Sequence, residues 1–397
     1  MTIKNSFEKI FRKIGIILVI SVLSFILIEL ISKIFMHYVN LEIKKEYLEH
    51  PVISKYPNGK DYLNDVYNYK WDRKFYPYYA FKEKEFKSKT ININHLGIRQ
   101  TIGNCQNKKS VKINIYGGST VLGVGVADDQ TIPSHLAKIL NQSLKKKNAD
   151  EIKKCYLVKN EGGGFWVSSQ DFIRFQNSIN KIDNEIDYAI FYQGINDIIA
   201  VKKGGKPGDM DPLYSYYLSF LNNNKLSVAK FMVNNSNTFS VISNLLFRIK
   251  KKSDKQNVVI INKIRNNSYI SSAISEIYIN NILNNSLICN RKQIKCIFIL
   301  QPYPLLTKKK LSKNEKKIFD SSKSENSLTM HDSNMKLSEK VYEKIINDKR
   351  VLKLNNFYDF TEIFDLDTQE LFVDTAHLLD LGNKIVANKI FNIIKKP

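Results

Sequence analysis

Ser119, Asp374 and His377 are the residues of this chain best suited to acyl-transfer chemistry. Ser119 follows Gly117 and Gly118 at the end of an alternating apolar run, and Asp374 stands three residues before His377. A serine hydroxyl becomes nucleophilic when a histidine takes its proton, and a carboxylate beside the imidazole fixes its tautomer. We therefore predict Ser119 as the nucleophile, His377 as the general base and Asp374 as the residue that orients it.

Two further stretches offer hydrogen-bond donors to a developing negative charge. Residues 160–164 (NEGGG) follow one apolar run, and residues 194–197 (GIND) follow another. Glycine amides and an asparagine side chain can stabilise the oxyanion that forms when a serine attacks an ester carbonyl. We predict that the oxyanion receives hydrogen bonds from the backbone N–H of Ser119, the N–H of Gly162 and the side chain of Asn196. The predicted supporting or substrate-contacting positions are Gly163 and Asp197.

The elements that must position these residues are alternating strands and helices. Apolar runs predict five strands, and periodic patterns between them predict helices. Strands separated by helical crossovers form a parallel sheet with helices on both faces, and ligands bind at the carboxyl ends of its strands. Four of the stretches named above follow predicted strands. The predicted strands are 111–116, 155–159, 187–193, 295–301 and 356–360; the predicted helices are 131–147, 168–182 and 382–394, with more in 227–252, 268–291 and 335–347.

The four stretches resemble, in order, blocks I, II, III and V of the SGNH (GDSL-type) hydrolases. Gly118 stands where the family name has aspartate, and Phe165-Trp166 shifts the usual spacing of block II. The resemblance covers Val111 to about Ile394 and extends to motifs at 76–78 (YPY) and 95–99 (HLGIR). It implies a flavodoxin-like three-layer α/β/α sandwich and esterase or acyltransferase activity without a metal or another cofactor.

The N-terminus predicts a membrane anchor. Residues 14–28 carry no charge, and the apolar character continues to Met36, which is long enough to span a bilayer. No small-residue cleavage site follows, so we expect an uncleaved signal-anchor over 14–36. Basic residues in 1–13 predict a cytoplasmic N-terminus and a periplasmic or cell-surface body. Glu29 is expected at the far interface, where its charge reaches water.

The rest of the chain divides by composition. Residues 37–110 form an aromatic-rich juxtamembrane lead-in, which we expect to pack on the catalytic body or to lie at the membrane surface. Residues 111–397 form the hydrolase-like domain, with an insertion at about 202–290 that is either a lid or a structural excursion. The sequence does not determine the oligomeric state.

Composition and motifs exclude several other functions. The net charge of +23 is spread along the chain and no nucleic-acid module is visible, so we expect no nucleic-acid partner. Six dispersed histidines without HExxH predict no metal site. Val121 breaks the Gly-x-Ser-x-Gly pattern. Four scattered cysteines leave one or two disulfides open.

These features predict an ester hydrolase that removes O-acyl groups, acetyl groups first, from an extracytoplasmic carbohydrate or glycolipid. Three alternatives stay open. An O-acyltransferase for a cell-surface polysaccharide would use the same triad, and a lipid esterase would prefer long acyl chains. A non-catalytic glycan-binding or scaffold protein would not need Ser119 at all.

Overall fold

The computed structural model describes residues 2–105, 110–145, 155–180, 185–202, 206–209, 235–243, 268–325 and 328–396. The chain divides into two compact units. One comprises residues 1–47 and 216–259, and the other comprises residues 48–215 and 260–397. The predicted catalytic residues all belong to the second unit.

The first unit is built on the long helix α1 (Thr2–Leu48), which includes the predicted anchor. Among the described residues, α1 is a helix long and apolar enough to cross a membrane or to act as a signal sequence. The Glu29 carboxylate accepts hydrogen bonds from the side chains or backbone of Ser236, Asn237 and Thr238. These donors from the 235–243 segment satisfy a charge that the apolar helix leaves without a partner.

The second unit contains one five-stranded parallel sheet in the order β6-β5-β7-β8-β9. Numbered along the chain, this is the 2-1-3-4-5 order of flavodoxin-like folds. All five predicted strands are confirmed. Their bounds are β5 (Ser110–Gly117), β6 (Cys155–Gly162), β7 (Tyr188–Gln193), β8 (Lys295–Leu300) and β9 (Phe357–Asp359).

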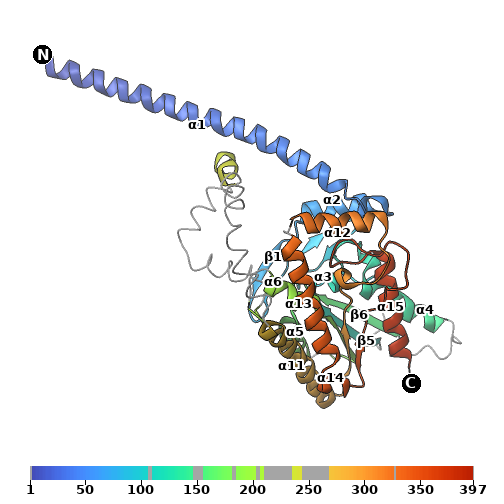
Figure 1. The fold of residues 1–397 in the computed structure, drawn as a ribbon. Coiled ribbons are helices and arrows are strands. Elements are labelled where there is room, and N and C mark those ends of the chain that lie inside the picture. The colour runs from blue at the N-terminus through green and yellow to red at the C-terminus, as the bar shows by residue number, and fades with distance from the viewer. Residues whose placement is uncertain are drawn as a thin grey trace. The chain divides into compact units, whose positions relative to one another are not determined.

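Helices cover both faces of this sheet and form two separate cores (Figure 1). In β5, Ile113 and Ile115 point to one face and Tyr116 to the other, because strand side chains alternate. The first face packs against α4 (Ile132–Lys145), α12 (Lys313–Glu325) and α15 (Asp380–Lys395). The second packs against α5 (Ser168–Ile179), α6 (Ile195–Lys202), α11 (Ser268–Lys292), α13 (Leu328–Ile346) and α14 (Lys349–Leu352). The predicted α/β/α sandwich is confirmed.

The lead-in after α1 packs on the catalytic body. A third apolar cluster joins Val52, Leu63 and Val66 of the lead-in to Val373 and Leu379, which flank the predicted Asp374–His377 pair. Residues 48–105 therefore belong to the same compact unit as the sheet. The boundary that we placed between residues 110 and 111 does not divide two compact units. The lead-in elements are α2 (Gly59–Tyr69), β1 (Arg73–Tyr76), β2 (Ala80–Glu83), β3 (Phe86–Lys87) and β4 (Asn92–Ile93).

The predicted insertion at 202–290 extends too far toward the C-terminus. Its last part is α11, whose residues Ile274, Tyr278 and Ile282 are buried against the sheet. This helix is an ordinary crossover that covers the sheet, because its apolar residues recur at helical spacing. Residues 210–234 and 244–267, where most of the predicted 227–252 helix falls, lie outside the described residues.

All four cysteines pair in the second unit. Cys105 is bonded to Cys155, and Cys289 is bonded to Cys296. The first bridge fastens the end of the lead-in to the start of β6, and the second closes the turn between α11 and β8. The two disulfides, which the sequence left open, are typical of an oxidising compartment.

Candidate active site

The structure brings Ser119, His377 and Asp374 into hydrogen-bonding contact. Ser119 begins the short helix α3 (Ser119–Leu122) directly after β5. Its Oγ lies 2.7 Å from His377 Nε2, although the two residues are 258 positions apart. His377 Nδ1 lies 2.7 Å from Asp374 Oδ2. This geometry lets the imidazole take the serine proton while the carboxylate holds its other nitrogen.

The loop that carries Asp374 and His377 is ordered mainly by its own backbone. Asp374 Oδ1 accepts the N–H of Ala376 at 2.7 Å and that of His377 at 2.8 Å. The Val373 N–H donates to the His377 carbonyl at 2.9 Å, which closes the turn. Burial raises the pKa of Asp374, but the neighbouring His377 charge and these hydrogen bonds outweigh it and lower the pKa to about 2. Asp374 is therefore ionised throughout the neutral range.

Packing explains why block I has glycine before the serine. A Cβ on Gly118 would collide with the side-chain amide of Asn196, which lies against the Gly118 backbone. Asn196 Nδ2 also donates to the Trp166 carbonyl at 2.8 Å. An amide nitrogen carries two hydrogens, so one N–H of Asn196 is held by Trp166 and the second is left for another acceptor. The structure thus places Asn196 directly beside the nucleophile turn.

The glycines of block II differ from the prediction. The N–H of Gly162 donates to Asn160 Oδ1 at 3.0 Å, and the N–H of Gly163 donates to the Gly117 carbonyl at 3.0 Å. The N–H of Gly164 donates to the carboxylate of Glu83. These amides donate to acceptors within the protein. Neither Gly162 nor Gly163, which we predicted as a supporting position, therefore presents its N–H to a substrate in this conformation. The Trp166 indole lies against Gly163, which leaves no room for a side chain there.

Asp197 supports the neighbouring helix. Its carboxylate accepts the hydroxyl of Ser168 at 2.5 Å and the backbone N–H of Ser168 at 3.1 Å, which joins α6 to the first residue of α5. Burial raises the pKa of Asp197 to about 6, although the Ser168 hydrogen bonds oppose that shift.

Arg99 holds the nucleophile loop in place, a role that sequence reasoning missed. Its side chain is 1% exposed, and its guanidinium donates to the main chain just after Ser119 as well as to Asp128 at 2.7 Å. All five guanidinium N–H groups have an acceptor. The sequence motif HLGIR marked the position but did not show what the arginine contacts. The acceptors are the carbonyls of Thr90, Leu122, Gly123 and Val126 and the carboxylate of Asp128.

The four blocks come together in the fold. They lie at the carboxyl edge of a 2-1-3-4-5 sheet, in the block order of the SGNH hydrolases, and the serine, histidine and aspartate are in contact. The chain has the flavodoxin-like α/β/α fold that the resemblance to the SGNH hydrolases implies. Within this fold, block I turns at Gly118, block III supplies Asn196, and block V supplies Asp374 and His377.

Comparisons with known proteins find similarity in shape alone. No protein-family model matches the chain, and no curated protein matches its sequence. An acetyl xylan esterase of known structure is 13% identical, with 72% of this chain and all of that chain covered at a TM-score of 0.36. A lipolytic G-D-S-L family protein from Veillonella parvula is 13% identical. The match covers 72% of this chain and 99% of that chain, at a TM-score of 0.32. An acetylxylan esterase from Geobacillus stearothermophilus is 13% identical. The match covers 75% of this chain and 98% of that chain, at a TM-score of 0.33.

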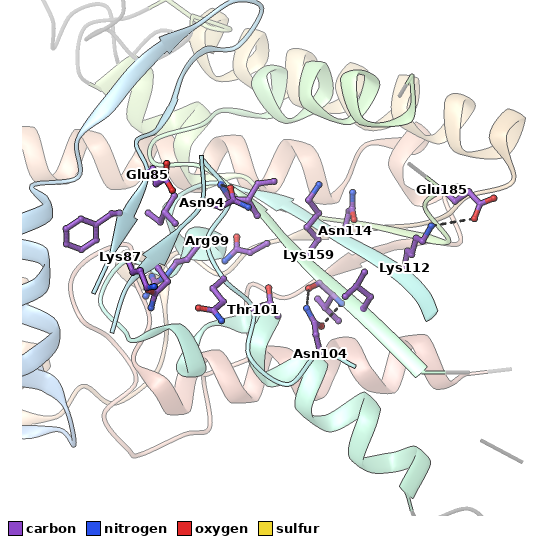
Figure 2. Close-up of a pocket in the computed structure, with 18 residues that line it drawn as sticks. Glu85, Lys87, Asn94, Arg99, Thr101, Asn104, Lys112, Asn114, Lys159 and Glu185 are labelled. Carbon is purple, nitrogen blue, oxygen red and sulfur yellow. Dashed lines mark hydrogen bonds and ion pairs between the residues drawn. The ribbon is translucent and has the colours of Figure 1, made fainter. Parts of the chain in front are cut away.

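A separate cavity of about 570 Å³ lies between the lead-in and the sheet. Figure 2 shows that Glu85 and Asn94 line it from the lead-in and that Lys112, Asn114 and Lys159 line it from β5 and β6. Ser119 and His377 are not among its lining residues. Within the described part of the chain, no three metal-binding side chains are grouped as a metal site requires.

Proposed function

We propose that the protein is a serine-dependent ester hydrolase that removes O-acyl groups, acetyl groups first, from an extracytoplasmic carbohydrate or glycolipid. The observation that carries this proposal is the pair of 2.7 Å contacts that join Ser119 to His377 and His377 to Asp374. A serine at the end of a strand, in contact with an imidazole that a carboxylate orients, is the arrangement that acyl transfer requires.

The residues perform the reaction in two steps. His377 Nε2 takes the Ser119 proton as Oγ bonds to the ester carbonyl carbon. His377 then gives this proton to the sugar oxygen as the bond between carbon and that oxygen breaks, which leaves an acyl-serine. In the second step a water loses a proton to His377 and attacks the acyl carbon. Ser119 regains its proton and the free acid leaves. Asp374 stays ionised and stabilises the imidazolium in both steps.

The oxyanion would receive hydrogen bonds from two groups beside Ser119. The backbone N–H of Ser119 lies in the first turn of α3, where N–H groups have no partner within the helix. The second N–H of the Asn196 side chain is the other donor. Gly162 is committed to Asn160, so it could contribute only after the block II loop rearranges.

The predicted topology supports a cell-surface substrate. The apolar helix α1 is long enough to anchor the chain, and the two disulfides are typical of an oxidising compartment. A domain exported in this way meets acylated glycans and glycolipids. A sugar hydroxyl that replaces water in the second step would make the same triad an O-acyltransferase.

Reaction with a fluorophosphonate tests the proposal on the full-length protein in detergent. We expect the probe to label Ser119, as located by mass spectrometry, and the label to disappear in Ser119→Ala. The matched control is Ser143→Ala, because the Ser143 hydroxyl donates to the Leu140 carbonyl of its own helix and Ser143 is not one of the predicted site residues. Absence of label on folded wild-type protein would contradict an activated serine and favour a binding protein. Acetate release with and without added oligosaccharide acceptor then separates hydrolysis from transfer.

A further inference from the structure

The β1–β2 hairpin of the lead-in borders the predicted active site. Its strands pair antiparallel, with Tyr76 opposite Ala80, so Pro77, Tyr78 and Tyr79 form the tip. One side of the hairpin packs on the block II loop, where Tyr79, Ala80 and Phe81 form a buried cluster with Trp166. The Trp166 carbonyl holds the Asn196 amide beside Gly118. The hairpin is thus connected to the turn that carries Ser119 through Trp166 and Asn196.

Polar contacts fix the hairpin to the block II loop. Glu83 is 1% exposed, and its carboxylate accepts the Gly164 N–H at 3.1 Å and the Tyr69 hydroxyl at 3.1 Å. Arg73 bonds to Glu83 and its guanidinium lies over the Phe165 ring, 5.1 Å from the centroid. A hairpin held by a buried carboxylate keeps a fixed position, so side chains at its tip have a fixed place relative to the site.

The hairpin also exposes two aromatic rings. Tyr78 is 75% exposed and Phe75 is 52% exposed, although burying either ring would be favourable. Tyr78 also adopts the left-handed conformation, with φ of 77°. Strained backbone persists at functional sites, where other contacts enforce it. Of the seven described non-glycine residues with left-handed φ, five lie in or against this hairpin: Lys70, Trp71, Tyr78, Ala80 and Phe165.

We propose that Phe75 and Tyr78 form a subsite that holds a sugar ring of the acylated substrate by stacking. The proposal rests on the proposed function, which makes the substrate a glycan ester. A pyranose ring presents a face of C–H groups that packs against the negative face of an aromatic ring. Exposed rings on a hairpin that packs on the block II loop would hold the sugar so that its ester reaches Ser119. The hairpin thus determines which glycans are cleaved.

Binding to the full-length protein in detergent tests this subsite directly. The Ser119→Ala variant cannot turn over substrate, so its Kd for a chemically O-acetylated xylo-oligosaccharide can be measured at equilibrium. We expect Tyr78→Gly in this background to weaken binding about tenfold, because it removes a stacked ring. Glycine tolerates the left-handed φ, so the variant does not strain the backbone. Phe75→Ala should act in the same direction. Tyr269→Ala, which removes an equally exposed ring from α11, should leave the Kd unchanged.

Activity measurements separate this proposal from the proposed function. With Ser119 intact, Tyr78→Gly should raise KM for the oligosaccharide about tenfold more than KM for p-nitrophenyl acetate, which has no sugar ring. Equal losses on both esters would overturn the subsite and leave the hydrolase standing. Wild-type protein that binds the oligosaccharide through Tyr78 but never cleaves it would sustain the subsite and refute the hydrolase.

A membrane contact is the competing use of exposed aromatic rings. A bimane label on Tyr78→Cys can be introduced selectively, because the four native cysteines are paired. Quenching of that label by doxyl lipids in a nanodisc of phosphatidylethanolamine and phosphatidylglycerol, together with an unchanged Kd for the oligosaccharide, would overturn the sugar subsite. An unquenched label with a weakened Kd supports it.

Discussion

The loop that carries Ser119 and the loop that carries Asp374 and His377 are held by different kinds of contact. The nucleophile loop depends on residues far away in the sequence, above all Arg99, which bonds to the main chain of residues 122–126. Tyr62 adds a further contact, because its hydroxyl accepts the Gly125 N–H. The Ser119 side chain is buried against this framework.

The acid–base loop is held mostly by neighbours in sequence. Asp374 bonds to the two N–H groups that follow it, and its side chain stays 41% exposed. Longer-range contacts also reach this loop: the buried Glu315 accepts the N–H of Leu371 at 2.8 Å, and the Thr120 hydroxyl donates to the Ala376 carbonyl at 3.4 Å. The comparison predicts that the two loops respond differently to mutation, since the polar contacts of the nucleophile loop come mainly from distant residues and those of the Asp374 carboxylate come from the next few residues.

Asp374→Asn tests the acid–base loop and should have the largest effect on activity. Asparagine keeps the oxygen that accepts the Ala376 and His377 N–H groups but presents an amide to His377 Nδ1, which selects the wrong tautomer. We expect ester hydrolysis to fall by about 10⁴-fold, with a smaller loss of stability than a break in the contacts of the nucleophile loop would cause. Steady-state kinetics and thermal unfolding of the same preparation decide this. A large loss of stability would show that this loop is coupled to the core after all.

Arg99→Met is the matching test of the nucleophile loop. It leaves Asp128 buried without its cation and frees four carbonyls near Ser119, so we expect a loss of roughly 3–5 kcal/mol of unfolding free energy. Fluorophosphonate labelling of Ser119 should slow even well below the melting temperature. Arg350→Met is the control, since Arg350 pairs with Glu276 and Asp348 at the surface and such pairs are worth about 1 kcal/mol or less. Equal losses of unfolding free energy in both variants would contradict the role of Arg99 in holding the nucleophile loop.

The same difference explains what could be predicted from the sequence. The Asp374–His377 pair could be recognised because three residues of spacing suffice to form the turn. The five strands and their parallel arrangement followed from alternating apolar runs and the crossover rule, both of which are local or general. Arg99 could not be assigned, because its acceptors are main-chain carbonyls, which leave no mark in the sequence.

Block II shows the limit most clearly. Three consecutive glycines suggested an amide facing the substrate, but a glycine run does not reveal which acceptor each N–H meets. Asn160, Gly117 and Glu83 take those N–H groups in the fold. Glu83 lies in the lead-in, outside the part of the chain that resembles the hydrolases. Its contact with Gly164 therefore depends on a tertiary arrangement that no local pattern contains.

Two aspartates near the site should contribute to folding stability with opposite dependences on pH. These pH dependences are the smallest of the expected effects. The pKa of Asp197 is raised to about 6 by burial, whereas that of Asp374 is lowered to about 2 by His377 and backbone hydrogen bonds that outweigh burial. Between about pH 4 and about pH 6, Asp197 is ionised in the unfolded chain but still protonated in the folded protein. Raising the pH through this window therefore favours the unfolded chain, and stability falls. Stability from Asp374 is present above about pH 4 and is lost as the pH falls toward 2.

Asp197→Asn isolates the first of these effects. The amide keeps an oxygen for Ser168 and removes the titration, so the variant should lose the decline between pH 4 and 6 and gain up to roughly 3 kcal/mol at pH 7. Urea unfolding at pH 4, 5, 6 and 7 measures this, with exposed Asp72→Asn as the control that keeps the wild-type slope. Asp171 is also buried and interacts with Asp197, so part of the slope should survive through Asp171. A full wild-type slope in Asp197→Asn would mean that Asp197 stays charged in the folded protein and that Ser168 alone compensates its burial.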